Sequence, residues 1–230
     1  MSGNRLLATL SPDVLDRIAP EVIQTELGQI LDPGDGVPSH VTFPHIGVIV
    51  SVVRADENGA AVEVALIGGT GATSIQSALA SLPSRSQIIV QVAGPVTRVS
   101  AEAVRELFAS DEAFRKAVLV YASVYIDQIS QNSICNRLHQ LEARLAKWLL
   151  AARRYAGTDT LTLTHEFLSH MLGVRRAGVT VGINELAMDG LIEHSRNTIT
   201  IKDRAGLELR ACECEGVLRE GWERLMEHTG

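Results

Sequence analysis

Two adjacent arginines, Arg175 and Arg176, come directly after the turn Gly173-Val174, at the predicted start of a helix. A guanidinium group is a planar set of N–H donors that can bind two acceptors of a guanine base or hold a phosphate. The N-terminus of a helix attracts phosphate as well. These residues therefore predict nucleic-acid-binding chemistry at this point of the chain.

The surrounding pattern predicts a winged helix-turn-helix. A strand at 161–163 precedes a helix at 165–172, a second helix at 175–189, and two short strands at 191–195 and 198–202. Apolar residues fall where two steeply crossing helices must pack, at Leu168, Leu172, Val174, Val179, Ile183 and Leu186. The second helix can then enter the major groove of DNA. The candidate DNA-binding residues are Thr164, His165, Arg175, Arg176, Thr180, Asn184 and Arg196, while Val179 is expected in the core.

Two features leave alternatives open. Winged helices also serve as protein-interaction modules, so a helix–Gly–helix pattern alone does not establish DNA binding. Gly178 and Gly182 lie within the expected recognition helix, where each costs about 1 kcal/mol relative to alanine. Close packing and flexibility before DNA binds both explain these glycines.

Short β-rich runs dominate residues 22–99, at 41–43, 47–53, 61–67, 87–92 and 96–99. Turn sequences such as Pro33-Gly34-Asp35-Gly36 and Asp56-Glu57-Asn58-Gly59 separate them. This spacing predicts an antiparallel sandwich or barrel of jelly-roll type. Ser11-Pro12-Asp13 predicts a brief helix before the first strands.

From Ser100 the apolar period becomes helical, with a short helix at 101–108 and a long one from Ser110 to about Asn136. Apolar or large side chains recur about every 3.5 residues along the long helix, at Phe114, Val118, Tyr121, Tyr125 and Gln128. We interpret this stripe as a dimerisation seam. The alternative is that the stripe packs against its own barrel.

These blocks together resemble the Crp/Fnr superfamily of bacterial transcription regulators over nearly the whole length. The segments that carry the resemblance are Gly28-Gln-Ile-Leu31, Val90-Gln-Val-Ala-Gly94, 141–149 and 161–201. The resemblance implies an α+β fold: a cyclic-nucleotide-binding-like β-roll at 1–109, a dimerisation helix at 110–136 and a winged helix-turn-helix with a C-terminal tail at 137–230. It also implies a homodimer on a pseudo-palindromic operator in double-stranded DNA, with RNA polymerase as a candidate partner.

The effector region departs from the family pattern. The resemblance implies an arginine that pairs with a cyclic phosphate and a glutamate that holds the ribose hydroxyl. Arg85 and Ser86 match the first element, and Gly71 and Ser74 lie in a loop whose N–H groups could cradle an anion. No acidic residue occurs between Glu63 and Glu102, however. We therefore do not expect cyclic AMP as the effector, and predict a different ligand or none.

The recognition helix departs as well. The family's common Arg-Glu-x-x-x-Arg reader keeps its first arginine as Arg176, but its glutamate and second arginine are replaced by Ala177 and Val181. An acceptor for cytosine and a second guanine reader are thus missing. The usual operator of the family is not expected.

The net charge of −6 first argues against a nucleic-acid binder. The charge is unevenly distributed, because residues 137–210 carry 11 basic and 8 acidic side chains, a balance of +3. Specificity must then come from a few placed groups and from dimerisation. The longest apolar run, 46–53, is too short to span a bilayer, so we expect a cytoplasmic protein without membrane contact.

No enzyme or cofactor signature is evident. Neither a Gly-x-Ser-x-Gly elbow nor a catalytic triad pattern occurs, so an enzyme is not expected. The three cysteines, Cys135, Cys212 and Cys214, include no Cys-x-x-Cys pair at zinc spacing. His165 and His170 are five residues apart, off the shared face that metal ligands need. The sequence predicts no metal site and leaves a redox role of Cys212 and Cys214 as an alternative to two ordinary helix cysteines.

Overall fold

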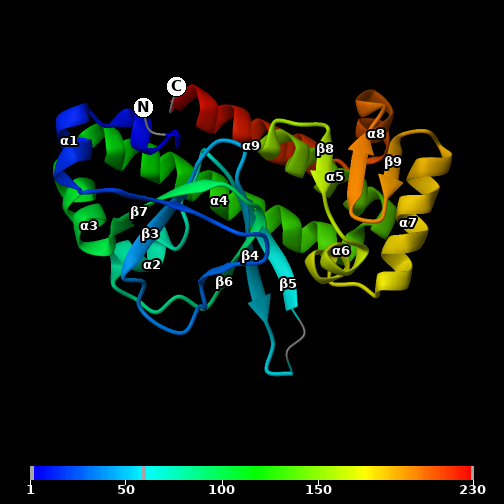
Figure 1. The fold of residues 1–230 in the computed structure, drawn as a ribbon, viewed down its shortest axis with the longest axis horizontal. Helices are drawn as coiled ribbons and strands as arrows, with labels where there is room; N and C mark the ends of the chain where they lie inside the picture. Colours follow the sequence, from blue (N-terminus) through cyan, green and yellow to red (C-terminus); the bar gives the residue numbers. More distant parts are fainter. Residues whose placement is uncertain (1–2, 59–60, 229–230) are drawn as a thin grey trace.

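The computed structural model describes residues 3–58 and 61–228. The predicted turn at 56–59 therefore lies partly outside the described residues. Figure 1 shows a β-roll on the left, a winged-helix domain on the right, and the long helix α4 running from one to the other. This arrangement confirms the predicted α+β fold with antiparallel sheets, a long helix and a C-terminal helix-turn-helix.

Two antiparallel sheets form the β-roll. One has the order β1-β7-β3 and the other the order β2-β6-β4-β5. The strands are β1 (Glu21–Gln24), β2 (Ile30–Asp32), β3 (His40–Pro44), β4 (Ile49–Ala55), β5 (Ala61–Ile67), β6 (Gln87–Val92) and β7 (Pro95–Ser100). The sequence pattern predicted five of these strands and missed β1 and β2, which are short and largely exposed.

Short helices cover the end of the roll and lead into the long one. They are η1 (Leu7–Thr9), α1 (Pro12–Arg17), α2 (Ile75–Ala80) and α3 (Ala101–Ser110). The long helix α4 (Glu112–Leu138) begins at Asp111, whose carboxylate accepts a hydrogen bond from the Phe114 N–H at 2.8 Å. This cap satisfies one of the free donors of the first turn, so α4 starts afresh although only Asp111 separates it from α3.

The C-terminal domain follows the predicted order closely. Helix α5 (Leu141–Ala156) leads through β8 (Thr160–Thr162) to α6 (His165–Leu172) and α7 (Arg176–Met188). Strand β10 (Thr198–Ile201) pairs with both β9 (Ile192–Ser195) and β8, which makes a three-stranded wing. Helix α8 (Arg204–Arg210) closes this domain. Its core contains the predicted Leu168, Leu172, Val179, Ile183 and Leu186.

The last helix is α9 (Cys214–His228), which lies in the segment predicted as the C-terminal tail. It turns back along α4, and Leu225 near its end is buried among residues of the β-roll and α4 (Figure 1). Near its start α9 also contacts α5, where the carboxylate of Glu215 forms an ion pair with Arg154. The tail helix therefore packs against both α4 and α5.

The predicted dimerisation seam requires a correction. Phe114, Val118 and Tyr121 are 0–4% exposed, and they pack in the same cluster as Val41, Phe43 and Val99 of the β-roll. Tyr125 and Gln128 are partly buried, and the Gln128 side-chain carbonyl accepts a hydrogen bond from the Leu66 N–H at 3.1 Å. The stripe thus follows the alternative interpretation, because the amphipathic face of α4 completes its own sensor core.

Candidate nucleic-acid interface

The helix-turn-helix is built by local capping. Thr164 accepts a hydrogen bond from the Phe167 N–H at 3.1 Å and begins α6. Gly173 ends that helix at φ +62°, a conformation that costs glycine little and other residues more. The chain then leaves at the angle that brings α7 across α6. These two positions explain why the sequence pattern placed both helices within one residue of their observed bounds.

The two glycines of α7 are explained by close packing. A Cβ added at Gly178 would lie 3.1 Å from a methyl carbon of Leu141, and one at Gly182 would lie 3.4 Å from a methyl carbon of Leu145. Both leucines belong to α5. The recognition helix therefore lies tightly on α5, and of the two explanations left open by the sequence, close packing has direct support.

The opposite side of α7 faces outward. Arg176, Ala177, Val181, Asn184 and Met188 are all exposed, with Val181 at 55% and Met188 at 80%. Their spacing places them along one helical face. Val181 replaces a polar reader of the family pattern, and an exposed aliphatic side chain at that place suits contact with the methyl group of thymine.

A groove runs between the N-termini of α6 and α7 and the wing. It has a volume of about 570 Å³, and its lining includes four of the predicted DNA-binding residues: Thr164, His165, Arg176 and Arg196. The remaining lining residues are Glu166, His194, Ser195 and Asn197. The structure thus brings together lining residues that are up to 33 positions apart in the sequence.

Thr180 joins this group indirectly. Its hydroxyl lies 3.0 Å from Nδ1 of His165 and 3.2 Å from the carbonyl oxygen of Arg176. Partial burial lowers the pKa of His165, and the nearby His194 and Arg176 charges lower it further. The imidazole is therefore held mainly neutral near pH 7 and serves as a hydrogen-bonding group that positions Thr180.

The arginines of the face are free to meet a ligand. Arg175, Arg176 and Arg196 are exposed, and none of the ion pairs among the described residues includes them. Arg175 occupies the N-cap position of α7, directly before Arg176, and Asn184 lies further along the helix. One acid, Glu166, lines the groove without pairing with these arginines.

Sequence reasoning missed His194, Ser195, Asn197 and Val181 as parts of this face. His194 and Ser195 end strand β9 and Asn197 lies in the turn that follows, so the position of all three against α7 depends on the pairing of β9 with β10. Val181 was noted only as a departure from the family pattern. The sequence does contain a signal for Val181. It lies four residues after Ala177 and seven before Met188, a spacing that places all three on the same face of a helix.

The predicted effector residues do not gather around one large cavity. Arg85 is exposed, the Ser74 hydroxyl donates to a carboxylate oxygen of Asp32 at 2.5 Å, and the Ser84 hydroxyl lies 3.4 Å from the Ser86 N–H. Gly71 lines a space of only about 10 Å³. The ring of Tyr121 fills the region beside Gly71, and its hydroxyl donates to the carbonyl oxygen of Ala72 at 2.7 Å.

Replacing Gly71 with alanine is expected to destabilise the protein by about 1–3 kcal/mol, the usual cost of overpacking a filled core. The new Cβ would lie 2.6 Å from a ring carbon of Tyr121 and 2.9 Å from a methyl carbon of Ile67. Urea unfolding measures the change. Gly216→Ala is the matched control, because its Cβ meets nothing within 4 Å in a helix. Equal stability of G71A and wild type would show that this space is not filled.

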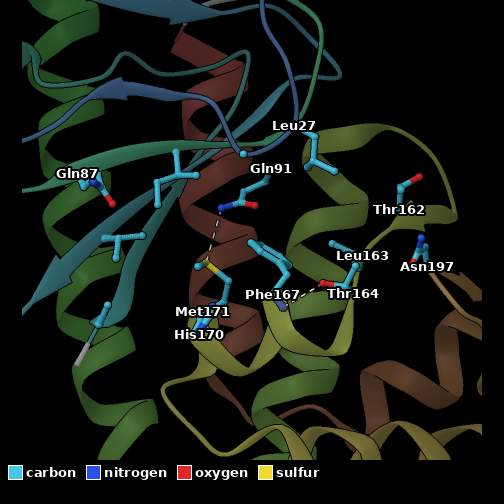
Figure 2. A pocket seen from close by; sticks show the side chains of 14 residues that line it. Leu27, Gln87, Gln91, Thr162, Leu163, Thr164, Phe167, His170, Met171 and Asn197 are labelled. Atoms are coloured by element: carbon cyan, nitrogen blue, oxygen red, sulfur yellow. Dashed lines mark hydrogen bonds between the residues drawn. The ribbon is translucent and has the colours of Figure 1, made fainter. Parts of the chain in front are cut away.

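The two domains meet around a second, larger and mainly apolar cavity. It has a volume of about 600 Å³ and lies between β5, β6 and the loop at Leu27 on one side and α6 with Leu163 on the other. Figure 2 shows Gln91 of the β-roll pointing toward Met171 of α6, with its amide 3.7 Å from the sulfur. A cavity of this size means that the interface between the two domains is incompletely packed here. Because the walls of the cavity belong to both domains, any reorientation of the domains changes the shape of the cavity.

The fold and the groove define a two-domain protein that pairs a β-roll with a winged helix-turn-helix. Residues 143–210 match the Crp-like helix-turn-helix domain model. Most of the chain has the fold of CRP/FNR-family transcriptional regulators, so the predicted resemblance to the Crp/Fnr superfamily is confirmed at the level of the fold and of the helix-turn-helix domain.

Solved structures show this likeness over most of the chain. A CRP/FNR-family transcriptional regulator from Thermus thermophilus is 20% identical, with a TM-score of 0.68, over 83% of this chain and 98% of the other. FixK2 from Bradyrhizobium japonicum is 14% identical, with a TM-score of 0.71 over 84% and 98%. The c-di-GMP-responsive regulator CLP of Xanthomonas campestris is 14% identical, with a TM-score of 0.66 over 83% and 99%. No match was found among curated proteins.

Proposed function

We propose that this protein is a Crp/Fnr-type transcription regulator that acts in the cytoplasm as a homodimer on a pseudo-palindromic DNA operator. The observation that carries the proposal is the groove between α6, α7 and the wing, where Arg176 and Arg196 lie exposed and outside any described ion pair. The alternative, a protein-interaction module on the same scaffold, is not favoured, because acids do not cover these arginines. Among the described helices, none is both long and apolar enough to cross a membrane.

The outward face of α7 supports direct reading of bases. Arg176 lies at the N-terminal end of the helix, where side chains of a recognition helix reach base edges, and Val181 and Asn184 follow on the same face. Thr164 and His165 at the N-terminus of α6 and Arg196 in the wing lie beside them and suit phosphate oxygens. This division assigns base contacts to α7 and positioning contacts to α6 and the wing.

The homodimer uses a different face of α4 from the predicted one. Leu119 is 57% exposed and Ile126 is 62% exposed, and they are seven residues apart. Ala122 follows Leu119 by three residues and is partly exposed. Ile129 follows Ile126 by three residues and lies at the edge of this face, where it also packs against the β-roll. A heptad of this kind suits a parallel helix pair. The stripe of Phe114, Val118 and Tyr121 supports the seam from behind by fixing α4 to the β-roll.

The effector of the proposed regulator is not cyclic AMP. The loop at residues 68–86 has no acid to hold a ribose hydroxyl, and the ring of Tyr121 occupies the region beside Gly71. Both observations favour a sensor domain that responds to another signal or that only supports the dimer.

Selection of bound sequences from a random pool of duplex DNA tests the function directly. We expect an inverted repeat whose half-sites are about one helical turn, roughly 34–36 Å, apart. Affinity for that sequence should fall with salt, with a slope of about −0.9 per neutralised phosphate. A pool that yields no enriched sequence, together with binding that does not depend on salt, would overturn the proposal.

Replacing Arg176 with alanine is expected to weaken operator binding by about 1–3 kcal/mol, or roughly 5- to 150-fold, if the arginine reads a base. Fluorescence anisotropy on the selected operator and on a scrambled duplex measures the effect. The matched control is Arg17→Ala on α1, an exposed arginine of the β-roll, which should leave affinity unchanged. Equal affinity of R176A and R17A would remove Arg176 from the interface.

A further inference from the structure

The three cysteines of the chain meet at one place. Cys135 lies near the end of α4, and Cys212 and Cys214 flank the start of α9, so the sulfur atoms come from segments 77 or more residues apart. All three thiols are free and buried. The imidazole of His139, at the C-terminal cap of α4, completes the group. One ligand atom from each of the four residues lies within 4.8 Å of every other.

The spacing of these atoms suits one tetrahedral zinc ion. With Zn–S distances of about 2.3 Å and Zn–N distances of about 2.0–2.1 Å, the edges of the tetrahedron are about 3.8 Å between sulfurs and about 3.5 Å between sulfur and nitrogen. The sulfurs of Cys135 and Cys212 are 3.6 Å apart, and the Cys214 sulfur is 3.3 Å from Nδ1 of His139. A disulfide would instead need about 2.05 Å between two sulfurs.

The surroundings of His139 match those of a metal-bound histidine. Its Nδ1 faces the sulfurs, and its Nε2 lies 3.1 Å from a carboxylate oxygen of Glu213. Ligating histidines commonly donate the N–H of the other ring nitrogen to a carboxylate, which fixes the tautomer and the ring orientation. Gln131 also donates its amide N–H to the Cys214 sulfur at 3.0 Å. Donors of this kind stabilise negative charge on sulfur.

A buried guanidinium supplies the charge balance. Arg144 is only 7% exposed. Arg144 donates to the side-chain oxygen of Asn136 and to the carbonyl oxygen of Leu172, its Nε has no partner, and no described ion pair includes it. Three thiolates, a neutral imidazole and Zn²⁺ carry a net charge of −1, which is the counter-charge that a buried guanidinium requires.

We propose that Cys135, His139, Cys212 and Cys214 bind one Zn²⁺ per protomer and that this ion ties α9 to the junction between α4 and α5. Only His139 and Gln140 separate those two helices, so the junction joins the β-roll and α4 to the winged helix. The four ligands leave no open position, which is typical of a structural site. The proposal does not depend on DNA binding, because metal content and affinity can be measured without DNA.

Elemental analysis of the full-length protein, purified without a histidine tag, tests stoichiometry. We expect about one zinc per protomer. After chelation and reduction, Co²⁺ should restore the visible bands of tetrahedral cobalt together with thiolate-to-metal charge transfer. Competition with a chromophoric chelator should give a dissociation constant of nanomolar order or tighter, roughly as for structural zinc in small domains. Amide exchange in α9 should rise when the metal is removed.

Matched substitutions separate ligation from folding. His139→Asn should lower zinc affinity at least as much as Glu213→Gln, which removes only the outer partner and should cost about 10- to 100-fold. The controls are His228→Asn and Glu220→Gln, two exposed residues of α9, and neither should change affinity. Circular dichroism checks that each variant is folded.

Two outcomes would overturn the proposal. One is a reduced, folded protein that takes up neither Zn²⁺ nor Co²⁺. The other is zinc affinity that is the same in H139N and H228N. Mass spectrometry that finds a Cys135–Cys212 disulfide in a protein without metal uptake would assign the cluster to thiol redox chemistry instead.

Discussion

Replacing Ile126 with glutamate is expected to convert the homodimer to a monomer at micromolar concentration. The side chain is 62% exposed in the middle of α4, on the face that we assign to the partner helix. In a symmetric dimer each substitution acts in both subunits, and two unpaired carboxylates would be buried at one contact. At several kcal/mol for each buried charge, the dimer dissociation constant should rise at least about 1,000-fold.

Light scattering coupled to size exclusion measures the association, and anisotropy on the selected operator measures its consequence. Monomers can bind only single half-sites, so the operator affinity should fall with the dimer. Leu209→Glu is the matched control, because Leu209 is 88% exposed on α8 and belongs to neither proposed face. An I126E protein that remains a dimer would place the seam elsewhere on the molecule.

Replacing Glu63 with glutamine is expected to remove a pH-dependent loss of stability. Glu63 in β5 is 6% exposed, and it accepts hydrogen bonds from the Ser51 hydroxyl and, at 2.8 Å, from the Trp148 indole N–H of α5. Burial raises its pKa from 4.5 to about 7, although these hydrogen bonds and the Lys147 charge act in the opposite direction. The carboxyl thus lies between the β-roll and the winged helix and is protonated at mildly acidic pH.

The direction of the effect follows from proton binding. Between pH 4.5 and 7 the folded protein holds a proton on Glu63 that the unfolded chain has lost, so stability falls as pH rises through this range. Above pH 7 the loss is complete and amounts to about 3 kcal/mol, on the order of 1.4 kcal/mol per pKa unit. A glutamine side chain can still accept a hydrogen bond from the Trp148 indole N–H and donate one to the Ser51 hydroxyl. Its amide does not titrate, so the pH-dependent loss of stability should disappear.

Urea unfolding at pH 5, 6, 7 and 8 distinguishes the variants. The E63Q protein should be more stable than wild type at pH 8, and the difference should shrink toward pH 5. Glu26→Gln is the control, since Glu26 is exposed in a loop and should leave the pH profile of wild type intact. A wild-type stability that does not fall between pH 5 and 7 would contradict the buried, protonated state of Glu63.

Local patterns were sufficient for most of the elements. Strand β5 and helix α6 have the predicted bounds, because a short apolar run and the caps at Thr164 and Gly173 are properties of neighbouring residues. The sequence pattern does not predict strands β1 and β2 or helix α2, because neighbouring residues alone do not define them. They are short, and the two strands exist through pairing with β7 and β6, which are more than 55 positions away.

The seam of α4 shows the limit of such reasoning for a site. The apolar period of α4 correctly predicts that one face of the helix is buried. Periodicity does not say which part of the protein, or which partner, buries that face. The protein covers Phe114, Val118 and Tyr121 with its own β-roll and leaves Leu119 and Ile126 outside. The choice between the two faces depends on how α4 docks after the chain has folded, which no residue of α4 specifies alone.

The sequence by itself determined the winged helix, its exposed arginines and the lack of an acid in the effector loop, because caps, turns and residue types act over a few positions. The tertiary structure alone decided that α9 returns along α4 and that Cys135 meets Cys212, Cys214 and His139. One physical reason explains both the path of α9 and the meeting of the cysteines. Burying the apolar face of α9 requires a partner far away in the chain, and the cysteines are brought together by that packing rather than by their spacing.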